Sequence, residues 1–494
     1  MNATMVGMKS VVVIASVIMA SVALAQPDTL WTRVYGDGYN QEARCIIVTQ
    51  DSCYLMVGKT GGGMYIVKVN RDGDLQWSRQ YFAGSGNDES AANSVIQTAD
   101  RGYLAAGVRE HWDPWYPWDP MGIDLEIWRT DSLGYLMWNR IYSQGWELVA
   151  YAIDASDDSC YIIAGYYQPT QSEYRDAYIM KIDDQGDTLW TRTYNRYFHD
   201  RFYSVRQTAG AGFIATGYTY VPSGANNELY LVKADFYGDT LWTRTYGGSL
   251  GWCAYDVRQT NDSGYIVAGS TYIGGISDFY FVKLDSAGNE LWERNYGVGY
   301  DDRANSVFQV GDNGYISVGY TREHNQPNSG DILLVRVDAA GEMLWNQRFG
   351  GDLADQGNCI LQTEEGNFII AGWTESFGAG GRDAYLIKTQ SDTALLVYPD
   401  QHFPEIPKTL MLCSIYPNPF NSQINLVYDT PICEHVCLTV SDILGRWVAT
   451  VIDEIISPGV HRIVWDSGDL PSGIYFVRMQ AGEFVKTRKV VLLK

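Results

Sequence analysis

Hydrophobic positions recur along most of this chain in short alternating runs, each followed by a turn rich in Asp, Asn or Gly. Over residues 254–296, the runs "AYDVRQT" and "GYIVAGST" are joined by "NDSG", and "DFYFVKLD" leads through "DSAGN" into "ELWERNY". A hydrophobic period of two indicates β-strands, and Asp, Asn and Gly adopt the backbone conformations that hairpin turns need. The segment therefore predicts four short antiparallel strands.

This four-strand pattern repeats along the chain. Three series of residues mark the repeats: a Trp in the fourth strand, a Gly that closes the second strand and a basic residue that ends the third. The members are Trp31, Trp77, Trp138, Trp190, Trp242, Trp292 and Trp345; Gly58, Gly107, Gly165, Gly217, Gly269, Gly319 and Gly372; and Lys68, Arg129, Lys181, Lys233, Lys283, Arg336 and Lys388. Short strands repeated in this way are typical of β-propellers. We therefore predict an all-β protein with a seven-bladed β-propeller over residues 26–390.

The fourth strand carries the octapeptide DTLWTRTY, at 187–194 and 239–246, with the near copy DTLWTRVY at 28–35. The repeats thus begin with a fourth strand and end with a third strand at 383–390. Pairing these two segments would close the ring and remove its open edge. The turn and Trp of each repeat resemble the blades of pyrroloquinoline-quinone-type propellers. No residues match a quinone site, so this resemblance implies a scaffold and no cofactor.

The repeat lapses at 391–411, where three prolines indicate a linker. Short strands and turns resume over 412–494 and predict a small Ig-like β-sandwich. Its motifs are "YPNPFN" (416–421), "DILGR" (442–446), "GVHRIVWD" (459–466), "LPSGIYFVRM" (470–479) and "KTRKVVLLK" (486–494).

These motifs resemble the type A sorting domain of the type IX secretion system. The residues that carry the resemblance are Tyr416, Pro417, Asn418, Pro419, Gly445, Gly473, Tyr475 and Lys494. The resemblance implies recognition by the type IX machinery, passage from the periplasm across the outer membrane, and release or attachment at the cell surface. An Ig-like module without a sorting role is the alternative interpretation.

The N-terminus has the order of a secretory signal peptide: Lys9, an apolar run over 11–22, and a small-residue cleavage site at 23–25. We therefore expect Sec export and a mature chain that begins near Gln26. No other run approaches the ~18 apolar residues that span a bilayer, so no transmembrane segment is expected in the mature chain. A net charge of −22 argues against a nucleic-acid partner.

Two of the eight cysteines, Cys45 and Cys359, occupy one repeat position in the first and last repeats. Ring closure would make them neighbours, so a disulfide bond between them is one interpretation. Buried free thiols are the other.

An insertion at 109–122, "REHWDPWYPWDPMG", breaks the repeat between a second and a third strand. Aromatic rings beside acidic groups suit a sugar, through stacking and hydroxyl binding. The candidate ligand-binding residues are Glu110, Trp112, Asp113, Trp115, Tyr116, Trp118 and Asp119. The alternative is a lid that packs on its own blade or on 195–203.

Acidic residues recur at two positions on the same predicted face. They open the third strand at Asp124, Asp176, Glu228, Asp278, Asp331 and Asp383, and they precede the first strand at Asp88, Asp200, Asp302 and Asp355. Hydrogen bonding in turns is one interpretation, and Ca²⁺ binding, with Asp278, Asp331 and Asp383 as candidates, is the other.

"GGSLG" (247–251) lacks the following helix that a nucleophile elbow needs, and no His spacing indicates zinc. No catalytic residue is predicted.

The resulting hypothesis is a secreted or surface-displayed binding module that docks a glycan or a surface protein on the face carrying 109–122. The alternatives are a glycan-active hydrolase or lyase that uses the acids at the mouth, which would require carboxylates ~5–10 Å apart, and a non-catalytic adhesion or scaffold protein.

Overall fold

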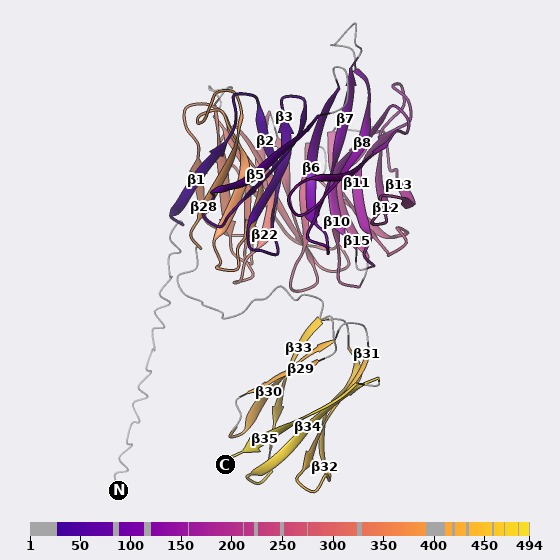
Figure 1. The fold of residues 1–494 in the computed structure, drawn as a ribbon, viewed down its shortest axis with the longest axis vertical. Helices are drawn as coiled ribbons and strands as arrows, with labels where there is room; N and C mark the ends of the chain where they lie inside the picture. The colour runs from indigo at the N-terminus through magenta and orange to yellow at the C-terminus, as the bar shows by residue number, and fades with distance from the viewer. Residues whose placement is uncertain are drawn as a thin grey trace, which may run out of the picture. The chain divides into compact units, whose positions relative to one another are not determined.

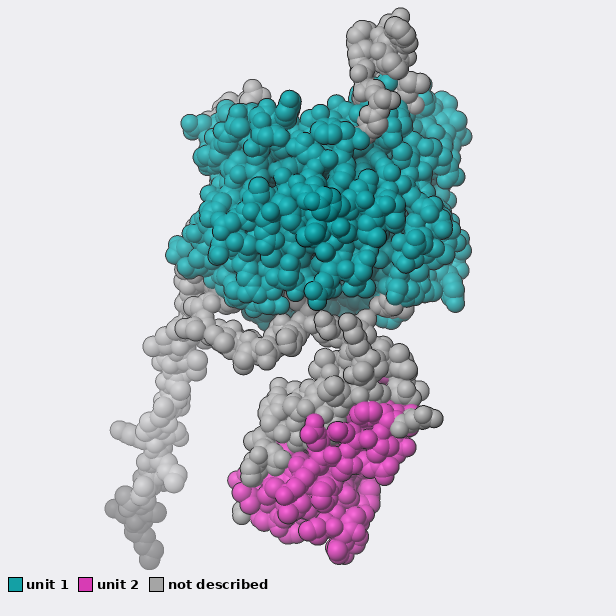
Figure 2. All heavy atoms as spheres, viewed as in Figure 1, with its two compact units in different colours: residues 1–394 teal, residues 395–494 magenta. Residues whose placement is uncertain are grey.

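The computed structural model describes residues 27–82, 88–112, 120–156, 158–210, 212–221, 226–247, 251–273, 275–323, 329–391, 411–416, 420–430, 434–456, 459–468, 470–482 and 484–493. The elements in these ranges are all β-strands, which confirms the all-β class. The chain divides into two compact units, residues 1–394 and 395–494 (Figure 2). The described part of the chain has no helix with the length and hydrophobicity that a membrane crossing requires.

The strands of the N-terminal unit are short and closely spaced. They are β1 (Thr29–Tyr35), β2 (Gln41–Val48), β3 (Tyr54–Thr60), β4 (Gly63–Val69), β5 (Leu75–Phe82), β6 (Glu89–Gln97), β7 (Tyr103–Trp112), β8 (Pro120–Thr130), β9 (Leu136–Tyr142), β10 (Glu147–Ala155), β11 (Tyr161–Gln168), β12 (Asp176–Ile182), β13 (Thr188–Tyr194), β14 (Asp200–Gln207), β15 (Phe213–Val221), β16 (Asn226–Ala234), β17 (Thr240–Tyr246), β18 (Gly251–Gln259), β19 (Tyr265–Ile273), β20 (Ile276–Leu284), β21 (Glu290–Tyr296), β22 (Asp301–Gln309), β23 (Tyr315–Arg322), β24 (Gly330–Val337), β25 (Met343–Phe349), β26 (Asp355–Gln362), β27 (Phe368–Thr374) and β28 (Asp383–Thr389).

These strands pair antiparallel in four-stranded repeats, in chain order (Figure 1). The repeats β2–β5 and β14–β17 are separate sheets. Two eight-stranded sheets each combine two such repeats through a single parallel pair, Ile123 with Glu147 and Ser277 with Asp301. The last sheet has the order β1-β28-β27-β26, so the first strand of the chain completes the last repeat. The predicted pairing of 28–35 with 383–390 is confirmed.

Hydrophobic clusters between successive repeats close the array into a ring. Each cluster draws on two consecutive repeats, as where Phe202 of β14 packs with Ile162 of β11. One further cluster joins the ends, with Met56 of β3 against Ile369 of β27 and Leu386 of β28. Fully burying a side chain of this size stabilises the fold by about 1.5–3 kcal/mol, so ring closure is a substantial source of stability.

The glycine that closes each second strand is required by a bulge in the first strand. In the first repeat, the register shifts between Ala43 and Cys45, and this directs the Glu42 carbonyl oxygen at β3. A Cβ atom at Gly58 would lie 1.7 Å from that oxygen. Because a bulge of this kind recurs in every first strand, only glycine fits the facing position.

The octapeptide is an outer-strand contact between repeats. In β13, the Tyr194 hydroxyl donates to the Gly238 carbonyl of the next repeat at 2.7 Å, and a Cβ at Gly238 would meet the Trp190 ring at 2.7 Å. Arg192 stacks over Trp190, with its guanidinium carbon 5.8 Å from a ring centroid. The motif therefore packs against the turn of the following repeat.

The basic residue that ends each third strand pairs with an acid in the turn between the first two strands. The pairs are Lys68–Asp51, Arg129–Asp100, Lys181–Asp158, Lys283–Asp262, Arg336–Asp312 and Lys388–Glu365, at 2.6–3.6 Å. Lys233 is the exception, because Gly210 occupies the acid's position. Its ammonium donates to Thr208 Oγ1 at 2.8 Å, and burial lowers the pKa of Lys233 to about 8.

Replacing Lys233 with Met should therefore stabilise the protein. The pKa of Lys233 is higher in the unfolded chain than in the folded protein, so protonation of Lys233 favours unfolding. This destabilisation is complete below pH 8 and disappears between about pH 8 and 10.4. We expect Lys233→Met to raise the free energy of unfolding by about 1–2 kcal/mol at pH 7, measured by urea denaturation, with a smaller gain at pH 10. Lys283→Met, which breaks an ion pair, should destabilise. A gain at Lys233 that does not change with pH would contradict this account.

The C-terminal unit contains two sheets around one core. Its strands are β29 (Met411–Tyr416), β30 (Gln423–Thr430), β31 (Glu434–Asp442), β32 (Trp447–Ile456), β33 (Gly459–Asp466), β34 (Gly473–Ala481) and β35 (Phe484–Leu492). The sheets have the orders β29-β30-β33 and β32-β31-β34-β35. Leu426 of the first sheet and Leu438 and Val477 of the second are fully buried in the shared core.

Candidate functional site

The insertion predicted to bind a ligand lies between β7 and β8. Only its first residues and its last three fall in the described ranges, with Glu110 and Trp112 on β7. Glu110 pairs in the ladder with Ile123, and the Trp112 side chain is half-buried. The other predicted site residues, Asp113, Trp115, Tyr116, Trp118 and Asp119, lie outside the described residues.

A charged network occupies the base of this insertion. The imidazole of His111 lies between Asp88 (Nδ1–Oδ2, 3.2 Å) and Asp124 (Nε2–Oδ2, 2.7 Å), and Arg109 binds Asp88 at 2.9 Å. Ser143 donates its hydroxyl to Asp124 at 2.7 Å. Because the Ser143 hydroxyl meets a carboxylate and not the imidazole, this network is not arranged as a nucleophile with its base.

The recurrent acids bind the turns at the ends of the strands. Asp302 accepts hydrogen bonds from the Val298 and Gly299 amides at 2.7 and 2.9 Å, and Asp383 accepts one from Ala379 at 2.7 Å. Burial raises the pKa of each calcium candidate, Asp278, Asp331 and Asp383. Among the described residues, no group of three or more His, Cys, Asp or Glu side chains is placed to hold a metal ion. Asp302 and Asp383 thus serve as hydrogen-bond acceptors for turns.

The first strands of the repeats line the inside of the ring and touch one another. We call them the inner strands: β2, β6, β10, β14, β18, β22 and β26. Their side chains bind backbone atoms of the next inner strand: Asn93 donates to the Ala150 carbonyl at 2.7 Å, and Asn358 donates to the Ala43 carbonyl at 2.8 Å. Side chains about 50 residues apart in the sequence therefore form common layers.

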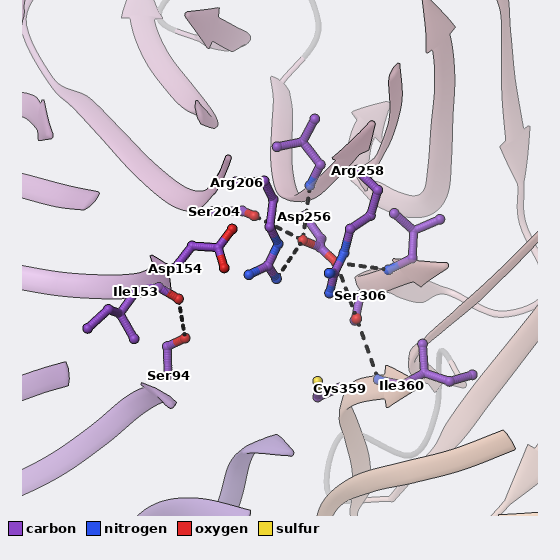
Figure 3. Close-up of polar contacts among 12 residues, drawn as sticks. Ser94, Ile153, Asp154, Ser204, Arg206, Asp256, Arg258, Ser306, Cys359 and Ile360 are labelled. Carbon is purple, nitrogen blue, oxygen red and sulfur yellow. Dashed lines mark hydrogen bonds and ion pairs between the residues drawn. The ribbon is translucent and has the colours of Figure 1, made fainter. Parts of the chain in front are cut away.

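One layer is centred on Asp256, a buried carboxylate with 4% of its surface exposed (Figure 3). Arg206 and Arg258 approach it at 3.5 and 3.3 Å. The hydroxyls of Ser204 and Ser306 donate to it at 2.9 and 3.3 Å. Burial opposes ionisation, but the Arg258 and Arg206 charges and these hydrogen bonds hold the pKa of Asp256 below its usual range. Asp256 thus ties β14, β18 and β22 together as an anion.

A second layer places three tyrosines side by side on consecutive inner strands. The ring centroids of Tyr151 and Tyr203 are 4.8 Å apart, and those of Tyr203 and Tyr255 are 5.2 Å apart. All three side chains are partly exposed. Flat, partly exposed rings in a row offer stacking surfaces to a ligand.

Two arginines flank this tyrosine row. The guanidinium carbon of Arg201 lies 4.4 Å from the Tyr166 ring centroid, and that of Arg303 lies 3.6 Å from the Tyr255 centroid. In both arginines the Nε atom is buried without a hydrogen-bond partner. The ion pairs found in the described ranges include no carboxylate for either. We call Tyr151, Tyr203, Tyr255, Arg201 and Arg303 the Tyr–Arg site.

The two arginine charges converge on the same neighbourhood. Cys253 lies on β18, between the strands of Arg201 and Arg303. Burial raises the pKa of its thiol, and both arginines oppose that rise. The site therefore concentrates positive charge in a chain whose net charge is −22.

The sequence does not single out this site, because the insertion at 109–122 is the more conspicuous break in the repeat. The signal that reveals it is a comparison of the same position in successive inner strands. "DRFYSVRQ" and "DDRANSVFQ" place Arg201 and Arg303 at one repeat position, where Cys253 stands in the repeat between them.

The C-terminal unit matches a known protein family. Residues 414–493 match the family described as the secretion system C-terminal sorting domain. The C-terminal unit is a sorting domain. The resemblance of its motifs to type IX sorting domains is thereby confirmed, and it indicates export by type IX secretion to the cell surface or beyond.

Several predicted motif residues have structural roles in the sorting domain. Gly445 takes a φ of +76° in the turn after β31, where its amide binds the Asp442 carbonyl at 3.0 Å. The Tyr475 hydroxyl donates to the Pro471 carbonyl at 2.8 Å. Tyr416 ends β29 and Gly473 begins β34. Pro417, Asn418, Pro419 and Lys494 lie outside the described residues.

The other comparisons yield distant similarities. A search of curated proteins finds no match to the sequence. Among solved structures, the polysaccharide lyase Uly1 is 10% identical and is matched over 72% of this chain and 91% of its own, with a TM-score of 0.47. Puromycin hydrolase is 12% identical, over 79% of this chain and 59% of its own (TM-score 0.43). PorZ of Porphyromonas gingivalis, a surface component of the type IX secretion system, is 8% identical, over 93% and 82% (TM-score 0.21). Similarities this low transfer no activity to this chain.

Proposed function

We propose that this protein is a secreted or surface-displayed seven-bladed β-propeller that binds an acidic glycan at the Tyr–Arg site. In this proposal, residues 1–25 are a signal peptide for Sec export, 26–390 form the propeller, 391–411 are a linker and 412–494 address the protein to the type IX machinery. The three seven-membered residue series and the four-stranded repeats support the blade count.

The observation that carries the proposal is that Arg201 and Arg303 have no carboxylate partner among the described residues. A partly buried guanidinium group without an anion leaves donors unpaired, which is costly in a folded protein. The carboxylate of a uronic acid or a sulfate ester would satisfy Arg201 or Arg303 with paired hydrogen bonds. Stacking on Tyr203 and its two neighbours would then hold the sugar ring.

The location of the site agrees with the proposal. Arg201 and Arg303 lie near the starts of β14 and β22, which are the first strands of their repeats. In an antiparallel repeat, the start of a first strand and the loop between the second and third strands lie at the same end. β7 ends and β8 begins at this end of their repeat, and the aromatic residues of the 109–122 insertion are proposed to extend the binding surface. A glycoside hydrolase would need two facing carboxylates, and two acids of this face, Asp302 and Asp383, accept hydrogen bonds from turn amides instead.

The proposal is tested by measuring affinity for a polyuronate, a sulfated glycan and a neutral glucan by isothermal titration calorimetry. We expect binding of the acidic glycans only. Removing two charged contacts, in Arg201→Ala/Arg303→Ala, should weaken it at least about tenfold, since hydrogen bonds to charged groups contribute about 1.5–3 kcal/mol each. Trp115→Ala/Trp118→Ala should weaken it less.

The matched control is Arg244→Ala, which removes an arginine stacked on an outer-strand tryptophan at 5.4 Å and should leave binding unchanged. Equal affinity for neutral and acidic glycans, or no loss in the double arginine variant, would overturn the acidic-glycan proposal. Binding only to a surface protein would favour the protein-docking alternative.

A further inference from the structure

The inner-strand layer of Asp256 also contains two thiols from opposite ends of the repeat array. Cys45 lies on β2, the first inner strand, and Cys359 lies on β26, the last. Each follows the bulge of its strand, so both occupy the same position in their repeats. Because the ring is closed, β2 and β26 are neighbours.

The contacts bring these thiols together. The residue beside Cys359 fixes the register of the two strands, because Asn358 donates to the Ala43 carbonyl at 2.8 Å. Cys359 Sγ lies 3.8 Å from the carbonyl oxygen of Ile46, the residue that follows Cys45. The two cysteines also shift each other's pKa. Cys359 is therefore held against the part of β2 that carries Cys45.

The surroundings distinguish the two thiols chemically. The hydrogen bond from Cys359 lowers the pKa of Cys45, burial opposes this, and the charge of Arg206 adds to the lowering. The same hydrogen bond and burial raise the pKa of Cys359. A thiol with a lowered pKa supplies the thiolate that starts thiol–disulfide exchange.

We propose that Cys45 and Cys359 form a disulfide bond in the exported protein and so lock the first repeat to the last. Two observations carry this inference: Cys359 packs against β2 next to Cys45, and a sorting domain sends the chain out of the reducing cytoplasm. β1 and β28 close the ring at its outer edge by strand pairing. The disulfide bond would close it covalently at the inner strands.

The oxidant would be a disulfide-bonded oxidoreductase of the export route. The Cys45 thiolate attacks one sulfur of the oxidant's disulfide, which forms a mixed disulfide and releases the oxidant's other sulfur as a thiolate. Cys359, after losing its proton, attacks the Cys45 sulfur and displaces the oxidant. Overall, the two cysteines lose two electrons and two protons, and the oxidant gains them as a dithiol.

The other described cysteines provide a contrast within the same chain. Cys53, Cys160, Cys253 and Cys437 are also thiols in the structure. None of the residues that shift their pKa is a second cysteine. They serve as internal controls for oxidation that does not depend on the pairing.

The test is peptide mapping of the full chain recovered from outside the cell. Thiols are alkylated under denaturing conditions without reductant, and the digest is analysed by mass spectrometry. We expect the peptides containing Cys45 and Cys359 to be linked, and Cys160 to be alkylated. Alkylation of both Cys45 and Cys359, or linkage of either to a different cysteine, would overturn the proposal. This result does not depend on the folding of any variant.

A second measurement tests the effect on stability. Reductant should lower the melting temperature of the exported wild type by about 5–10 °C, because the bond closes a very long loop. Cys45→Ser/Cys359→Ser should melt at the reduced value whether or not reductant is present, and Cys160→Ser should respond like the wild type. A melting temperature of the exported wild type that reductant leaves unchanged would contradict a locking role for the bond. Neither peptide mapping nor the melting temperature depends on glycan binding. A negative result for the disulfide bond can therefore be distinguished from a negative result for the proposed function.

Discussion

Deleting residues 412–494 is expected to abolish surface display and to leave the truncated protein in the periplasm. The deleted segment holds the sorting domain matched over 414–493. It is a separate compact unit with its own hydrophobic core. Its deletion therefore removes the sorting signal and leaves the hydrophobic core of the N-terminal unit intact. The measurement is immunoblotting of medium, outer-membrane and periplasmic fractions, with protease added to whole cells to detect surface exposure.

The deletion has a direct rescue control. Fusing residues 1–411 to the sorting domain of an unrelated type IX cargo should restore export, because the fusion again carries a sorting signal. The melting temperature of the retained N-terminal unit should show whether the truncated protein is folded. Undiminished surface display of a folded truncated protein would refute the sorting role.

Replacing Asp256 with Ala is expected to cost about 3 kcal/mol of stability, because it leaves two partly buried arginines without their anion. Arg206 and Arg258 approach the carboxylate at 3.5 and 3.3 Å, and the hydroxyls that donate to it would also lose their acceptor. Asp256→Asn keeps an acceptor and should cost less. The exposed Asp184 provides the matched control, since Asp184→Ala should change stability by less than about 0.5 kcal/mol.

The pH dependence of this effect has a definite sign. The folded pKa of Asp256 lies below its unfolded value of about 3.9. The charged carboxylate therefore stabilises the protein fully above about pH 4, and this contribution is lost as the pH falls through the folded pKa. Urea unfolding curves should show the full difference between wild type and Asp256→Ala at pH 7 and a smaller one near pH 3. A difference that is small at pH 7, or unchanged at pH 3, would show that Asp256 does not act as a buried anion.

Several features of the fold follow from the sequence because their causes are local. Alternation of hydrophobic residues and Asp-, Asn- and Gly-containing turns predicts the antiparallel strands, and β1 pairs with β28 as the starting point of the repeat requires. The Trp and Tyr of the octapeptide contact the turn of the next repeat, so their recurrence reflects packing. The sorting motifs are contiguous and identify the C-terminal unit directly.

The candidate site depends on contacts that the order of residues does not display. Arg201, Arg303 and Tyr203 are ordinary members of strand patterns in the sequence, and the insertion at 109–122 attracts more attention because it breaks the repeat. Only the packing of successive repeats brings inner strands about 50 residues apart against one another, which sets Tyr203 between Tyr151 and Tyr255.

By itself, the sequence determined the all-β class, the strand order, the closing pair β1 and β28, and the sorting domain. The strands, turns and sorting motifs rest on local spacing, and the closing pair rests on the repeat position at which the chain begins and ends. Tertiary structure alone decided that Asp256 meets Arg206, that Cys359 packs against the strand of Cys45, and that the Nε atom of Arg201 has no hydrogen-bond partner among the described residues. The physical reason is that hydrogen bonds, charges and sulfur contacts act over a few ångströms in space, and the closed ring determines which distant residues come that near.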